Sequence, residues 1–258
     1  MDNCAFTARD QESLTWGFNQ LESVFSPYKF DLQQYVSNDR DLQSRIDVDA
    51  QRETPVKVKL LGMHWDRVED TLSTRPISLD VSAATKRMIL KTVASQFDLY
   101  NYNGPILNRS RLFLHRLQCK KDLDWDEQLS PELLREWRAI ARQGNSTPEI
   151  NVERFEGGRD LSYKLIAFSD SSKAMYGVVV YIQDLETKKV SFLLAKNRIV
   201  NSQLETKSIP SLEVQGISLA TECILDLYED LAGNSCIQPI KVKELEVYTD
   251  SLVSLSLG

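Results

Sequence analysis

Three carboxylates, Asp170, Glu213 and Asp250, stand at places where an acidic side chain could bind a metal ion. Asp170 follows the apolar run 165–169 and precedes a polar turn, and Asp250 ends the short alternating run 245–249. Carboxylates at neighbouring strand ends, joined by one from a helix, meet at one edge of a sheet. Two divalent cations about 4 Å apart need several such ligands to hold the attacking water and the leaving oxygen of a phosphodiester. The three acids therefore predict metal-assisted phosphodiester hydrolysis with Mg²⁺ or Mn²⁺.

The apolar patterns around these acids predict an α/β fold, a mixed sheet with one packed helix. The expected strands are 165–169, 176–182 and 190–195, which form an antiparallel meander, and 245–249. A helix is expected from Ser208, with Pro210 in its first turn, to a stop near Gly233. Its apolar stripe consists of residues at helical spacing: Ile217, Ala220, Ile224, Leu227 and Leu231. Glu213 lies one turn before Ile217, so we expect it on the face turned toward the sheet.

Each acid taken alone has an ordinary alternative as a turn or helix-cap residue. The ordered series of strand, strand, strand, helix and strand, with an acid at three of its junctions, favours a shared site instead. This preference depends on the series and not on any single residue.

A second chemical feature is a basic segment at residues 85–121, in a chain whose net charge is −6. It holds eight basic residues against the single acid Asp98, and therefore has a net charge of +7. The basic residues are Lys86, Arg87, Lys91, Arg109, Arg111, Arg116, Lys120 and Lys121. Interleaved apolar residues predict two amphipathic helices with cationic outer faces. Such a face would bind nucleic-acid phosphates, and the alternative is an ordinary solvated helix surface.

Several short motifs together resemble the ribonuclease H region of BEL/Pao-type retrotransposon Pol polyproteins. They are Phe168-Ser169-Asp170-Ser171-Ser172, Tyr176-Gly177-Val178-Val179, Leu194-Ala195-Lys196-Asn197-Arg198, Ile209-Pro210-Ser211-Leu212-Glu213 and Tyr248-Thr249-Asp250-Ser251. Upstream, three motifs are similar to the segment that joins reverse transcriptase to ribonuclease H: Leu60-Leu61-Gly62-Met63-His64-Trp65-Asp66, Thr85-Lys86-Arg87-Met88-Ile89-Leu90 and Leu123-Asp124-Trp125-Asp126-Glu127. A further motif, Phe30-Asp31-Leu32, resembles the end of the polymerase domain.

The resemblance implies four regions. Residues 1–84 would be a remnant of the reverse transcriptase C-terminal or thumb region, with α+β character, and 85–143 a helical connection. Residues 144–160 would be a linker, and 161–258 a truncated ribonuclease H-like domain.

The resemblance also implies a site and its partners. Asp170, Glu213 and Asp250 would be the first three metal ligands, and the partners would be an RNA–DNA hybrid and the rest of the Pol polyprotein. A fourth acidic ligand has no counterpart before Gly258, and no Asp-Asp dipeptide of a polymerase occurs. We therefore expect a nucleic-acid-binding, catalytically incomplete domain. The alternative is an active ribonuclease H.

Other enzyme classes fit the sequence less well. The Pao family label suggests an aspartic peptidase, but the Asp-Ser pairs at 170–171 and 250–251 lack the glycine that such a turn requires. The two histidines lie in no hydrolase motif, and the four cysteines are scattered without zinc spacing. No stretch approaches the roughly 20 apolar residues of a membrane span, and the N-terminus has no signal-peptide pattern. An intracellular protein that does not enter a membrane is expected.

Overall fold

The computed structural model describes residues 6–8, 10–29, 32, 34–60, 62–154, 161–200, 208–232 and 239–250. The motif residues Phe30 and Asp31, and most of the second half of the expected linker, lie outside these ranges. The chain divides into two compact units. The first comprises Met1–Arg75 with Ile150–Arg154, and the second Pro76–Glu149 with Phe155–Gly258.

The first unit combines two helices with a small antiparallel sheet. Its elements are α1 (Gln11–Phe25), the short 3₁₀ helix η1 (Ser26–Tyr28), α2 (Arg40–Asp49), β1 (Lys57–Leu60), β2 (Met63–Asp66), β3 (Thr71–Ser73) and β4 (Asn151–Glu153). The strands follow the order β1-β2-β3-β4. The mixed helix and strand content expected for this part of the chain is therefore present.

Strand β4 lies inside the stretch 144–160 that was expected to be a linker. Val152 pairs with Leu72 of β3, and next to the strand Arg154 Nη2 lies 2.6 Å from Asp70 Oδ2. Both charged side chains are largely buried, which strengthens the pair relative to an exposed one. A three-residue strand that pairs with a segment about 80 residues away leaves no periodic pattern in its own sequence, so the linker expectation was wrong at 151–153.

The second unit begins with three helices around one core. They are α3 (Lys86–Ala94), α4 (Gly104–Cys119) and α5 (Pro131–Asn145). The expected start at Ser130-Pro131 is confirmed, because the Ser130 hydroxyl accepts from the Leu133 N–H at 3.4 Å. Trp137, expected to be a core residue, is fully buried and stacks on Phe113 with ring centroids 5.7 Å apart.

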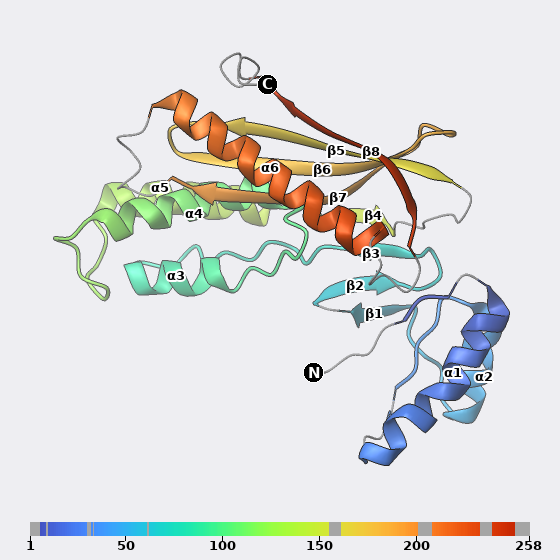
Figure 1. The fold of residues 1–258 in the computed structure, drawn as a ribbon. Coiled ribbons are helices and arrows are strands. Elements are labelled where there is room, and N and C mark those ends of the chain that lie inside the picture. Colours follow the sequence, from blue (N-terminus) through green and yellow to red (C-terminus); the bar gives the residue numbers. More distant parts are fainter. Residues whose placement is uncertain are drawn as a thin grey trace. The chain divides into compact units, whose positions relative to one another are not determined.

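The same unit continues into a four-stranded mixed sheet covered on one face by a long helix (Figure 1). The strands are β5 (Ser162–Ser171), β6 (Met175–Asp184), β7 (Val190–Ile199) and β8 (Lys241–Thr249), in the order β7-β6-β5-β8. Strands β5, β6 and β7 form an antiparallel meander, and β8 joins β5 in parallel after the crossover helix α6 (Ile209–Ala232). The expected mixed sheet with a packed helix is confirmed.

Helix α6 packs with a slightly different stripe from the expected one. The buried residues are Leu212, Gly216, Leu219, Ala220, Cys223 and Ile224. Ala220 and Ile224 match the expectation, whereas Ile217 is only half-buried. The stripe shifts because Gly216, which has no Cβ, lets the helix backbone approach β5 closely. None of the helices within the described ranges is long and apolar enough to cross a bilayer.

Replacing Trp137 with alanine should destabilise the second unit by about 3–5 kcal/mol, because it leaves a cavity in a packed core. It also removes the hydrogen bond from Trp137 Nε1 to the Asp80 carbonyl (2.9 Å). Urea unfolding followed by circular dichroism measures the change. Trp16→Ala on α1 is the matched control, because 67% of Trp16 is exposed, and its effect should stay within about 0.5 kcal/mol. Similar losses for the two variants would contradict this view of the core.

Candidate functional site

Two of the three acids lie at neighbouring ends of parallel strands. Asp170 is the penultimate residue of β5, and Asp250 directly follows β8. In the β5–β8 register Phe168 is opposite Tyr248 and Ser169 is opposite Thr249, so Asp170 and Asp250 come next on their strands. The fold thus brings together two carboxylates that are 80 residues apart in the chain.

The first turns of α6 lie against the same end of β5 and carry the third acid. The Ser171 hydroxyl donates to the Leu212 carbonyl at 3.0 Å, one residue before Glu213. One turn further along, a Cβ on Gly216 would lie 2.5 Å from Ser171 Oγ and 3.8 Å from the Asp170 carbonyl oxygen. The hydrogen bond from Ser171 to Leu212 and the close approach at Gly216 therefore fix the helix against the strand. Glu213 lies between these two contact points along α6.

The three side chains differ in exposure and do not converge. Asp170 and Asp250 are exposed, and Glu213, which was expected on the face turned toward the sheet, is half-buried. One Asp170 oxygen accepts from the Ser171 N–H at 2.7 Å. Within the described residues, no three His, Cys, Asp or Glu side chains form a group that could hold a metal ion. The backbones meet at one sheet end, but the carboxylates are not arranged as a finished ligand set.

The donor set nevertheless suits a hard divalent cation. Mg²⁺ and Mn²⁺ prefer carboxylate oxygens, and one or two of them usually suffice when waters and substrate phosphates complete the shell. Carboxylates brought close together repel one another in the absence of a cation.

Lys86 does not belong with the phosphate-binding residues that the basic segment suggested. Only 4% of it is exposed, and its Nζ donates to the carbonyls of Lys120 (3.2 Å) and Leu123 (2.7 Å). The ammonium also lies 5.4 Å from the centre of the Trp125 ring. Its charge is used inside the fold to fix the loop after α4, so the assignment of Lys86 to nucleic-acid binding was wrong.

Two other basic residues are engaged by neighbouring side chains. Arg87 donates from Nε (2.7 Å) and Nη2 (2.9 Å) to the carboxylate of Asp126, and this contact lowers the pKa of Asp126. Arg111 is half-buried, and its Nη1 donates to the side chains of Asn101 and Asn108, both at 3.1 Å. Burial lowers the pKa of Arg111, which nearby Asp98 partly opposes. Lys91, Lys120 and Lys121 remain exposed.

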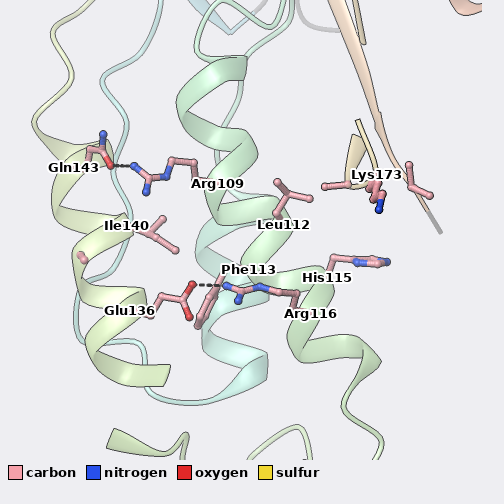
Figure 2. Close-up of a pocket in the computed structure, with 12 residues that line it drawn as sticks. Arg109, Leu112, Phe113, His115, Arg116, Glu136, Ile140, Gln143 and Lys173 are labelled. Atoms are coloured by element: carbon pink, nitrogen blue, oxygen red, sulfur yellow. Dashed lines mark hydrogen bonds and ion pairs between the residues drawn. The ribbon is translucent and has the colours of Figure 1, made fainter. Parts of the chain in front are cut away.

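Arg109 and Arg116 line a groove of about 730 Å³ together with a cation that the sequence did not single out. Figure 2 shows Arg109 directed at Gln143 and Arg116 at Glu136, with Lys173 on the opposite side. The groove lies between helices α4 and α5, the β5–β6 turn and the end of β7. Lys173 stands three residues after Asp170 in that turn. The turn itself was expected, but only the tertiary fold brings its lysine opposite the α4 arginines.

Comparison with known proteins identifies a family. The family model of the Pao retrotransposon-like RNaseH-like domain matches residues 85–251, more than half of the chain. No curated protein sequence matches this chain.

Among solved structures, a foamy viral protease-reverse transcriptase dRH in complex with double-stranded DNA is 11% identical, with 98% of this chain and 39% of that chain covered and a TM-score of 0.47. The foamy viral protease-reverse transcriptase in complex with an RNA/DNA hybrid is 13% identical, with 97% and 30% covered and a TM-score of 0.45. The chain thus spans less than half the length of these structures, and no site residue is assigned from them.

The contact between Gly216 and Ser171 can be tested with a double-mutant cycle. Gly216→Ala should destabilise the second unit by about 1 kcal/mol or more, since the clash outweighs the roughly 1 kcal/mol gain in helix propensity. Ser171→Ala should cost about 1 kcal/mol through the lost hydrogen bond. The double variant should be more stable than the sum of the single effects predicts, because removal of the hydroxyl makes room for the new methyl group. Urea unfolding of all four proteins gives the coupling energy, and strictly additive losses would refute the close approach.

Proposed function

The chain belongs to the family of Pao retrotransposon-like RNaseH-like domains, and on this premise we propose that it binds the phosphate backbone of an RNA–DNA hybrid. The observation that carries the proposal is the groove lined by Arg109, Arg116 and Lys173, the last a residue of the turn that follows Asp170. Three cations in one groove, with Glu136 as an acidic partner, favour an anion. A nucleic-acid backbone that follows the groove to the acidic end of the sheet would bring a phosphodiester next to the carboxylates.

Each residue then has a defined task. Arg109 and Arg116 are held in place by Gln143 and Glu136, so less side-chain freedom is lost when they meet a phosphate. Lys173, which is exposed in its turn, contributes a flexible point charge. Lys91, Lys120 and Lys121 add exposed positive charge on the same helical segment and would strengthen attraction at low salt.

Hydrolysis of the RNA strand is the second candidate function, and the placement of the acids favours it. Asp170, Glu213 and Asp250 would hold Mg²⁺ or Mn²⁺. When bound, the ion would polarise the scissile phosphate and lower the pKa of a water molecule. The side chains must first turn toward one another, since within the described part of the chain they do not form a ligand group. Binding without cleavage is therefore the principal proposal, and cleavage the alternative.

Cleavage and binding can be separated in one series of experiments. The purified chain is incubated with a labelled RNA–DNA hybrid and Mg²⁺ or Mn²⁺, beside Asp170→Asn and the control Asp230→Asn at the far end of α6. We expect salt-sensitive binding by all three proteins and no cleavage. Cleavage that disappears in Asp170→Asn but persists in Asp230→Asn would replace the principal proposal with the hydrolytic one. Absence of hybrid binding at low salt would refute both.

The groove itself can be tested by the salt dependence of binding. Arg109→Ala and Lys173→Ala should each reduce the slope of log K against log salt concentration by about 1, because each removes one phosphate contact. Lys241→Ala is the matched control, since Lys241 is exposed at the end of β8 remote from Asp250, and its slope should equal that of the unaltered protein. Fluorescence anisotropy over a salt series gives these slopes. Equal slopes for all four proteins would show that phosphates do not enter the groove.

A further inference from the structure

A row of aromatic rings crosses the face of the β5–β8 sheet opposite α6. Phe192, Tyr181, Phe168 and Tyr248 come from β7, β6, β5 and β8 in spatial order. Their successive ring centroids lie 5.8, 6.1 and 5.3 Å apart, and the last pair is stacked. The core beneath α6 uses the alternate residues of these strands, such as Leu165, Ala167 and Val180. The rings therefore belong to the other face, which we term the aromatic face.

The aromatic face is covered at one end and open at the other. At the β7 end, the Tyr102 ring lies 4.6 Å from that of Phe192, and burial raises the pKa of Tyr102 to about 12. At the β8 end, 46% of Phe168 and 48% of Tyr248 are exposed. Two large exposed rings in contact form an apolar patch, and such patches in soluble proteins mark interaction sites.

Charged side chains on the same face limit what can bind there. Strand alternation places Lys164 and Asp170 with Phe168, and Glu244, Glu246 and Asp250 with Tyr248. Four acids thus accompany one lysine, and that lysine already lies 3.1 Å from Glu246. A nucleic acid would meet negative charge here, and so would the same face of a second copy. A partner with positive charge fits.

We propose that the aromatic face docks an amphipathic helix of another protein, with an apolar stripe flanked by lysine or arginine. The opposite face of the sheet already packs a helix, α6, and a sheet with apolar residues on both faces is completed by a helix on each. Leucine-like side chains would cover Phe168 and Tyr248, and the flanking cations would meet Glu244 and Asp250. This inference does not involve the groove residues Arg109, Arg116 and Lys173, but a docked helix and the hydrolytic alternative would compete for Asp250.

A synthetic helix can serve as the probe. A labelled Leu/Lys peptide of about 18 residues is roughly 27 Å long, enough to cross four strands spaced about 4.8 Å apart. It should bind the full chain in fluorescence anisotropy, whereas a matched Leu/Glu peptide should not. The double variant Phe168→Ser/Tyr248→Ser should weaken binding at least about tenfold. Glu244→Lys, which leaves the rings in place, should also weaken it. Phe97→Ser is the matched control, because Phe97 is 42% exposed outside the aromatic face, and it should leave binding unchanged.

Several outcomes would overturn the proposal. Equal binding of the Leu/Lys peptide to the unaltered protein and to the folded double variant would place the contact elsewhere, as would a full effect of Phe97→Ser. A single-stranded oligonucleotide that binds the unaltered protein but not the double variant would make the face a base-stacking surface instead. Self-association that the double variant abolishes would identify a second copy as the occupant. Unchanged binding by Glu244→Lys would refute charge recognition even if the double variant does not fold.

Discussion

The parallel pairing of β8 with β5 is the contact on which the candidate site depends. It aligns Ser169 with Thr249 and so carries Asp170 and Asp250 to the same sheet end. A tight hairpin cannot place β8 parallel to its neighbour, and α6 lies in the longer connection that leads from β7 to β8. The close approach at Gly216 and the hydrogen bond from Ser171 to Leu212 hold the crossover against the sheet. The candidate site and the aromatic face both take their positions from this arrangement.

The periodic elements could be predicted from the sequence because their patterns are local. Runs of apolar residues indicated β5, β6 and β7, and the Ser130-Pro131 start indicated α5. The exact buried stripe of α6 could not be read in the same way. Hydrophobicity places Ile217 in the stripe, whereas close packing places Gly216 there, and a glycine has no hydrophobic signal.

Charge was less predictable than apolar periodicity, for a physical reason. A lysine has the same sequence signature whether it is solvated or bonded to backbone carbonyls. Lys86 proved to be buried, with carbonyls from the loop after α4 as its acceptors. Lys173 stood in a plain polar turn, yet the fold sets it opposite Arg109 and Arg116. Both outcomes depend on contacts between segments far apart in the chain. The contact between Arg154, next to β4, and Asp70, 84 residues earlier in the chain, is a third case of the same kind.

The edge position of β8 has a consequence for how the acidic end of the sheet forms. Within the described residues β8 pairs with β5 alone, and its ion pair between Lys164 and Glu246 joins residues 82 apart in sequence. The meander β5–β6–β7 needs only short turns, while closure of the β8 contact must offset the entropy of a much longer loop. Local opening of this one edge strand would therefore separate Asp250 from Asp170 while leaving the meander intact. A ligand that bridges the two carboxylates would act against that opening, so the order of the edge strand and the occupancy of the site are thermodynamically linked.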